Sequence, residues 1–335
     1  MDKYALLFLA AFLVNCLLTP VFAKLSLAMG IIDHPSRRRF HLSSMPMLGG
    51  AAMAASFYAV AWYAGGAPLF REYWGLFAAA LIMMCAGLYD DIKGLKPSLK
   101  LAMQVGAAGL IMANGIMLRA TGFPPLDAVM TVIWVAGIIN ALNLVDNIDG
   151  LSSGTAAIGS CFFALFALLM GKPQVAIIAV IFSGVCMGFL FHNFHPASLF
   201  LGDAGSMFVG TLLSGFGLLV ARPGDAVTTL AIGVVLGLLI FDTGLVVIMR
   251  LSHGFHITDG GKDHTSHRLC TLGLGVQGSV TVLFGVCFIF GVCAIAMLKV
   301  PRHQALLIPL ILLLIAMTFW FLLKDTYDYS QHKVE

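Results

Sequence analysis

The sequence predicts an all-α, polytopic integral membrane bundle of about eleven transmembrane helices. Of its 335 residues, 60% are hydrophobic and only 10% are charged, against about 25% charged residues in soluble domains. Apolar stretches recur along the chain, each close to the roughly 20 residues that a helix needs to cross the hydrocarbon. Because lipid offers no hydrogen bonds to a backbone, such stretches form helices and not open strands.

The apolar stretches define the predicted spans. We place them at 4–23, 48–65, 73–89, 100–118, 128–144, 154–170, 174–191, 204–221, 227–249, 278–298 and 304–323. Val21–Ala23 resembles a signal-peptide cleavage site, but the long apolar run before it favours a retained first span. We expect one transmembrane catalytic domain over 1–335, with active-site loops near 31–47, 89–99, 143–153, 192–206 and 250–277.

Polar clusters occupy alternate gaps between the spans, which places them on one membrane face. Twelve of the 19 Lys and Arg residues and nine of the ten His residues lie on that side. The positive-inside rule therefore predicts that this face is cytoplasmic, with the N-terminus outside and the C-terminus inside. The net charge of +3 gives no indication of a nucleic-acid partner, and we expect none.

Asp90 and Asp91 end the third span. Adjacent helical residues point about 100° apart, so both carboxylates reach one partner only if a cation or a helix end draws them together. Two acids at the end of an apolar span are costly and favour a functional site, although a solvated helix end is the alternative.

Asn143, Asp146 and Asp149 follow an i, i+3, i+6 pattern at the end of the fifth span. On a continuous helix they share one stripe, and Gly150 then ends the helix as a C-cap. A simple cap needs one polar residue, so three in line favour a site for a polar ligand or cation.

Asp203 lies in the sequence Gly202–Ser206, at the start of the eighth span. One interpretation is that it opens that helix as an N-cap. The free amides of a helix N-terminus also suit a phosphate, and a carboxylate suits Mg²⁺, so both interpretations stay open.

His264 and His267 lie in the longest polar loop, together with Lys262, Asp263 and Arg268. Two histidines three residues apart suggest zinc, but no third nitrogen or sulfur ligand lies at the usual spacing. A basic cluster near carboxylates suits recognition of an oxyanion better.

Two other polar positions leave alternatives open. Arg38 and Arg39, with His41, either set the topology or neutralise a phosphate at the bilayer surface. Asp242 is buried in the ninth span, as a functional acid or as the partner of a neighbour.

These motifs, in this order, resemble those of the polyprenyl-phosphate N-acetylhexosamine-1-phosphate transferases, which form glycosyltransferase family 4. The likeness covers about residues 30–270, and the first loop is similar to the undecaprenyl-phosphate GlcNAc-1-phosphate transferase branch. The resemblance implies a bundle of ten or eleven helices in the bacterial inner membrane. It also implies Mg²⁺, or Mn²⁺ in its place, with a UDP-N-acetylhexosamine and undecaprenyl phosphate as substrates; a homodimer is a further expectation.

The resemblance assigns roles to the motif residues. It implies a metal site at Asp90, Asp91 and Asp203, and catalytic roles for these acids and for His264 and His267. It implies substrate contacts from the other motif residues, which are Arg38, Arg39, His41, Lys100, Asn143, Asp146, Asp149, Gly150, Lys262 and Arg268.

The sequence departs from the family pattern at three positions. Gly94 stands where a third acid often follows the pair. The family's nucleotide-sugar motif corresponds to Asn143, Asp146, Asp149 and Gly150, called the nucleotide motif below, and Asn147 stands where a glycine usually separates its two acids. Ser266 replaces the middle histidine of a His-x-His-His run. This last change concerns the sugar more than the reaction.

The predicted reaction transfers N-acetylhexosamine-1-phosphate, with GlcNAc-1-phosphate as the first choice, from a UDP-sugar to undecaprenyl phosphate. It releases UMP and is the first membrane step of cell-surface polysaccharide synthesis. A phospho-MurNAc-pentapeptide transferase is the alternative within the superfamily, disfavoured by the first loop and the altered histidine run. A cation-coupled secondary transporter is the alternative from another class. Broken helices and inverted repeats are typical of it, and no repeat is visible.

Overall fold

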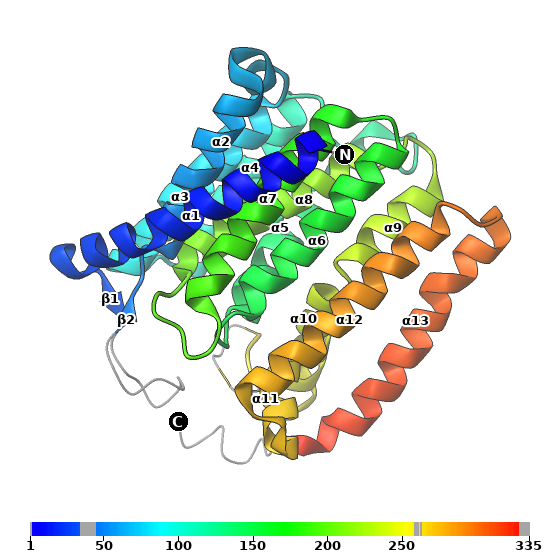
Figure 1. Ribbon diagram of the computed structural model, residues 1–335. Helices are drawn as coiled ribbons and strands as arrows, with labels where there is room; N and C mark the ends of the chain where they lie inside the picture. The colour runs from blue at the N-terminus through cyan, green and yellow to red at the C-terminus, as the bar shows by residue number, and fades with distance from the viewer. Residues whose placement is uncertain (1, 34–44, 258–260, 262, 328–335) are drawn as a thin grey trace.

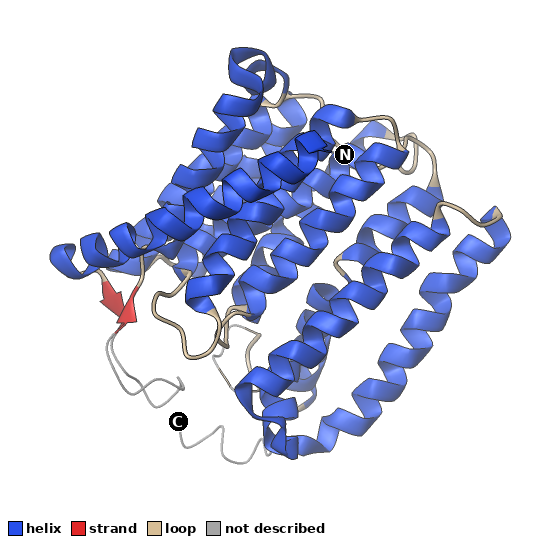
Figure 2. Cartoon of the chain, in the orientation of Figure 1, coloured by secondary structure: helices blue, strands red, loops and turns tan. Residues whose placement is uncertain are grey.

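The computed structural model describes residues 2–33, 45–257, 261 and 263–327. Within these ranges the chain is almost entirely helical, which confirms the predicted fold class (Figure 2). The first helices are α1 (Asp2–Met29), α2 (Gly49–Glu72), α3 (Trp74–Lys93), α4 (Pro97–Ala113), α5 (Pro124–Val145), α6 (Leu151–Leu169) and α7 (Pro173–Asn193). The later ones are α8 (Gly202–Val220), α9 (Ala226–Val235), α10 (Gly237–Ser252), α11 (Thr265–Leu269), η1 (Cys270–Leu274), α12 (Gly275–Met297), α13 (Arg302–Leu323) and η2 (Lys324–Thr326).

The strands form one small ribbon near the end of α1. β1 (Ile32–Asp33) pairs antiparallel with β2 (Met45–Pro46), so that Ile32 lies opposite Pro46. The ribbon brackets the first predicted active-site loop.

The predicted number of eleven spans is not confirmed. In the described ranges, eight helices are long and apolar enough to cross a membrane, or nine if α9 and α10 form one bent span. α2 is not among them, and α4 is a shorter apolar helix of 17 residues. The predicted span 227–249 is broken, because α9 and α10 meet at a bend of 73°. The chain is a multi-pass membrane protein.

α8 is the central helix of the bundle. In its apolar window 89% of the residues are buried, against 6% for α13, which forms the outer edge in Figure 1. α8 packs against α3, α5 and α2. Aromatic rings pack edge to face in this core. The ring centroid of Phe57, in α2, lies 5.7 Å from that of Phe182, in α7, and 6.0 Å from that of Phe208, in α8.

Two glycines set the N-terminus of α8 directly against its neighbours. A Cβ on Gly50 of α2 would lie 2.1 Å from the backbone nitrogen of Gly205. A Cβ on Gly87 of α3 would lie 2.2 Å from the carbonyl oxygen of Asp203. Only glycine lets the three backbones approach this closely, and the approach brings the end of α3 to the start of α8.

Candidate active site

Side chains from four helices converge at one end of the bundle. The Nζ of Lys100, in α4, lies 2.7 Å from Oδ2 of Asp203, in α8, and also pairs with Oδ2 of Asp90, in α3. Asn143, near the end of α5, donates from Nδ2 to Oδ1 of Asp203 at 2.7 Å and to the hydroxyl of Ser206 at 2.9 Å. Two carboxylates from distant parts of the chain thus share one ammonium group.

Asp91 has a different partner from Asp90. Its two carboxylate oxygens accept hydrogen bonds from the backbone amides of Asp203, at 2.8 Å, and Ala204, at 3.0 Å. The interpretation of Asp203 as the N-cap of the eighth helix is therefore wrong, because α8 begins at Gly202 and Asp91 accepts from the amides of Asp203 and Ala204. The free amides that suggested a phosphate site at this terminus are partly taken by the protein itself.

The donor atoms of this cluster fit Mg²⁺. Asp90 and Asp203 supply hard carboxylate oxygens, and both already surround one positive charge. Mg²⁺ usually binds one or two carboxylates and completes its octahedron with waters and substrate phosphates. Among the residues that the structure describes, no three His, Cys, Asp or Glu side chains form a metal-binding group, so a closed cage such as structural zinc uses is not present there.

The motif of Asn143, Asp146 and Asp149 does not form one helical stripe, because only Asn143 lies in α5. α5 ends at Val145, so Asp146 follows the helix and Asp149 lies in the turn before α6. Asn147 donates from its side chain to the carbonyl oxygen of Leu144 at 2.8 Å, a local bond that competes with continuation of the helix. Gly150 has φ +81° and precedes α6, so it is an N-cap and not the predicted C-cap.

Asp149 is held by the loop that follows α7. Its Oδ2 lies 2.8 Å from Nδ1 of His195 and accepts from the backbone amide of Ala197 at 3.1 Å. From the same loop region, Asn193 accepts from the backbone amide of Gly150 at 3.1 Å. The loop thereby fixes the nucleotide motif.

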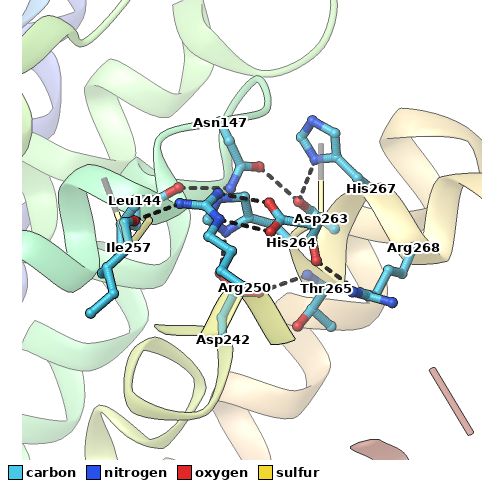
Figure 3. A network of polar contacts seen from close by, with 11 residues as sticks. Leu144, Asn147, Asp242, Arg250, Ile257, Asp263, His264, Thr265, His267 and Arg268 are labelled. Atoms are coloured by element: carbon cyan, nitrogen blue, oxygen red, sulfur yellow. Dashed lines mark hydrogen bonds and ion pairs between the residues drawn. The ribbon is translucent and has the colours of Figure 1, made fainter. Parts of the chain in front are cut away.

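The polar loop that carries His264 and His267, called the histidine loop below, is tied to α10, as Figure 3 shows. Nδ1 of His264 lies 2.7 Å from Oδ2 of Asp242, and the backbone amide of Thr265 donates to Oδ1 at 2.7 Å. Both side chains of the pair are almost fully buried. Of the two interpretations of Asp242, the structure supports the paired one.

A buried ion pair anchors the same loop. Arg250, in the last turn of α10, donates from Nε and Nη2 to the two oxygens of Asp263, at 2.8 and 2.7 Å. Burial disfavours the charged carboxylate of Asp263, but the hydrogen bonds and charge of Arg250 outweigh it and lower the pKa of this group. Arg250 also donates to the carbonyl oxygen of Ile257 at 2.9 Å.

Arg268 is fully buried and bonded to backbone. It donates to the carbonyl oxygens of Asp263 at 2.8 Å, Leu323 at 2.8 Å and Lys324 at 3.1 Å. These contacts join the histidine loop to the end of α13. His267 is also buried, and Arg38, Arg39, His41 and Lys262 lie outside the described residues.

Sequence reasoning did not select four polar residues that hold the site together. They are Asn193, His195, Ser206 and Arg250. The polar gap at 192–196 was visible as a signal, whereas the pairing of Arg250 with Asp263 depends on how the loop folds back on α10.

An apolar cavity of about 580 Å³ lies between α9, α10, α12 and α13. Leu230, Phe241, Gly244, Phe290 and Trp320 are among the residues that line it. Phe241 directly precedes Asp242, so α10 contributes both to the cavity and to the support of the histidine loop.

The fold and the site define a polytopic membrane protein with an acid-rich site around the ammonium of Lys100 at one end of its helices. The family model for glycosyl transferase family 4 matches residues 73–221. Over 324 residues the chain is 32% identical to the probable undecaprenyl-phosphate N-acetylglucosaminyl 1-phosphate transferase of Bacillus subtilis. The alignment covers 94% of this chain and 90% of the relative. The chain is 27% identical over 320 residues to the decaprenyl-phosphate N-acetylglucosaminephosphotransferase of Mycobacterium tuberculosis strain H37Rv, with 84% of this chain and 79% of the relative covered.

A third relative is the phospho-N-acetylmuramoyl-pentapeptide-transferase of Desulforudis audaxviator. It is 32% identical over 244 residues, or 61% of this chain and 72% of the relative. The chain belongs to glycosyl transferase family 4, among the polyprenyl-phosphate N-acetylhexosamine-1-phosphate transferases.

Proposed function

We propose that this protein transfers GlcNAc-1-phosphate from UDP-GlcNAc to undecaprenyl phosphate and releases UMP. The names of the Bacillus and Mycobacterium relatives support N-acetylglucosamine as the sugar and a polyprenyl phosphate as the acceptor. The excess of Lys and Arg in the motif-bearing gaps supports a site on the cytoplasmic face of the bacterial plasma membrane, with the N-terminus outside. A homodimer stays a prediction.

One observation carries the proposal: Asp90 and Asp203 both pair with the ammonium group of Lys100, and Asn143 donates a hydrogen bond to Asp203. Both substrates carry phosphates, so a site for their reaction has to neutralise negative charge and position two anions. Asp90 and Asp203 would hold Mg²⁺, which would stabilise the charge that develops on the diphosphate. Lys100, which already lies between them, supplies a second positive charge.

The reaction is a displacement at phosphorus. An oxygen of the lipid phosphate attacks the phosphorus that bears the sugar, the bond from that phosphorus to the bridging oxygen breaks, and UMP leaves with that oxygen. A phosphate monoester has a second pKa near 6, so at neutral pH the attacking oxygen needs no base. The work of the protein is to hold the two anions in line.

We assign separate tasks to the polar residues. Asp91, whose carboxylate is bonded to the first amides of α8, positions Asp203. The turn that carries Asp146 and Asp149 binds the nucleotide sugar, and His264 and His267 contact its phosphates. Arg268 maintains the loop through its backbone contacts.

The apolar cavity beside α10 would take part of the polyprenyl chain of the acceptor. It is lined almost only by aliphatic and aromatic side chains, and it borders the helix that carries Asp242. A lipid tail placed there would bring its phosphate to the end of the bundle where the acids lie.

The test is transfer of radiolabelled GlcNAc-1-phosphate to undecaprenyl phosphate by the purified protein, with Mg²⁺ and with a chelator. Asp203→Asn removes one charge of the cluster and is expected to lower kcat by at least about 10²-fold, as loss of an electrostatic contact in an active site does. Asp225→Asn is the matched control, because Asp225 caps α9 at the opposite end and asparagine caps equally well. Near-normal turnover by Asp203→Asn, or transfer that is indifferent to the chelator, would defeat the assignment.

The same assay separates the alternatives. A panel of UDP-sugars that includes UDP-MurNAc-pentapeptide identifies the donor. A transporter would form no lipid-linked product with any of them.

A further inference from the structure

Asn147, in the turn after α5, and Ser266, in the loop that carries His264 and His267, are in direct contact. The hydroxyl of Ser266, in the histidine loop, donates to Oδ1 of Asn147, in the turn after α5, at 2.7 Å. The two residues are separated by 119 positions in the chain, and Ser266 is only 1% exposed. Figure 3 shows Asn147 between Leu144 and the histidine loop. The contact therefore joins the nucleotide motif to the loop that carries His264 and His267.

The orientation of the Asn147 amide is fixed by its other bond. Its Nδ2 donates to the carbonyl oxygen of Leu144 at 2.8 Å, and a flipped amide would place two oxygens against each other there. Oδ1 must then face Ser266. Because a serine hydroxyl has only one proton, that proton is committed to Asn147.

This commitment determines what Ser266 can do for His267. The Oγ of Ser266 lies 3.1 Å from Nδ1 of His267. With its proton already used, Oγ can only accept, so Nδ1 must carry the hydrogen. The neutral imidazole of His267 then has its lone pair on Nε2.

We propose that Asn147 is a positioning residue, which acts through Ser266 to fix the ring tautomer of His267. Asn147 and Ser266 act as a pair, since the amide affects His267 only through the hydroxyl opposite it. The tautomer assignment is independent of the reaction. Its consequence for turnover rests on the proposed function, in which His267 contacts the phosphates.

The tautomer can be read directly from the full-length protein. In protein labelled with ¹⁵N-histidine, two-bond ¹⁵N–¹H spectra distinguish the Nδ1–H from the Nε2–H form, and His267→Gln identifies the signals of His267. We expect the Nδ1–H form in the parent protein. Asn147→Ala frees the hydroxyl of Ser266 to donate to Nδ1, so the neutral ring should shift toward the Nε2–H form.

Two other variants make the test specific. In the double variant Asn147→Ala/Ser266→Ala, His267 should give the same spectrum as in Ser266→Ala alone, because the amide acts only through the hydroxyl. Asn114→Ala removes a half-buried amide contact at the opposite end of the bundle and should leave the signals of His267 unchanged.

An unchanged His267 spectrum in a folded Asn147→Ala variant overturns the proposal. Transfer assays supply the second readout: Asn147→Ala should lower kcat by about tenfold to a hundredfold, by analogy with the hydrogen-bonding partners of metal-bound imidazoles, with little change in KM. If the spectrum shifts and kcat does not, the tautomer assignment stands and the role of His267 in the proposed function fails.

Discussion

Two neighbouring acids in α3 have different partners and, we infer, different tasks. Asp90 faces Lys100 and the shared site, whereas Asp91 accepts from the first amides of α8. The sequence identifies the pair and indicates that the two side chains diverge, because adjacent helical residues point about 100° apart. It cannot indicate which acid faces which partner, since α8 lies more than a hundred residues further along the chain.

Because Asp90 and Asp91 have different partners, the same substitution at each position should have a different effect. Asp91→Asn turns an amide nitrogen toward a backbone N–H, which should lower the free energy of unfolding by about 1–3 kcal/mol, as an unsatisfied buried group does. Asp90→Asn should leave thermal unfolding close to that of the parent protein and raise the Mg²⁺ concentration needed for half-maximal transfer. Thermal unfolding and a Mg²⁺ titration of activity check both statements. The same profile for both variants would contradict this division of tasks.

Among the elements, the start of α8 is the part that the fold positions most closely. It lies against α2 and α3 through glycine backbones, and the side chains of the site extend from these contacts. The sequence shows many glycines in apolar helices, which is typical of close packing in a membrane. Which of them is required depends on the neighbour, so it could not be read from composition.

Gly50→Ala is expected to destabilise the protein through this contact. Its Cβ would lie 2.1 Å from the backbone nitrogen of Gly205, and such overpacking costs about 1–3 kcal/mol or more. Gly109→Ala, in α4, is the matched control, because a Cβ there has no atom within 4 Å. It should be neutral or slightly stabilising, since alanine favours helix more than glycine does. Thermal unfolding in detergent compares the two, and equal stability would refute the packing argument.

Two elements differ from their predicted form for local reasons. α5 ends at Val145 because the side chain of Asn147 bonds to Leu144, a choice that the i, i+3, i+6 pattern does not reveal. The bend between α9 and α10 falls inside a continuous apolar run. Periodicity is absent from such a run, so the sequence gives no sign of a change in direction.

At the scale of the whole molecule, the polar site lies at one end of α3, α4, α5 and α8, and an apolar cavity lies between α9, α10, α12 and α13. The fold class could be predicted because composition alone determines that apolar segments of this length are helical in lipid. The convergence of Asp90, Lys100, Asn143 and Asp203 could be expected only from the resemblance. The supporting contacts of Arg250 required the three-dimensional fold.

If the cavity holds the polyprenyl chain, a substitution that fills it should weaken binding of the lipid substrate and leave binding of the nucleotide sugar unchanged. Gly244 lines it, and a Cβ at this position has no atom within 4 Å, so Gly244→Trp should fill space without a clash in the backbone. We expect KM for undecaprenyl phosphate to rise about tenfold, equivalent to about 1.4 kcal/mol, with KM for UDP-GlcNAc unchanged. Gly285→Trp, at an open position of α12 outside the cavity, is the control. An equal rise for both lipid and nucleotide would argue against a lipid site.

The ammonium of Lys100 gives the pair Asp90 and Asp203 a resident counter-ion from the chain itself. Two like charges are thereby held together before any ligand arrives, so the folded state does not depend on a divalent ion to suppress their repulsion. A protein starved of Mg²⁺ should melt at the same temperature as one supplied with it, while its turnover disappears. Differential scanning calorimetry with and without EDTA, alongside the transfer assay, tests whether shape and activity separate in this way.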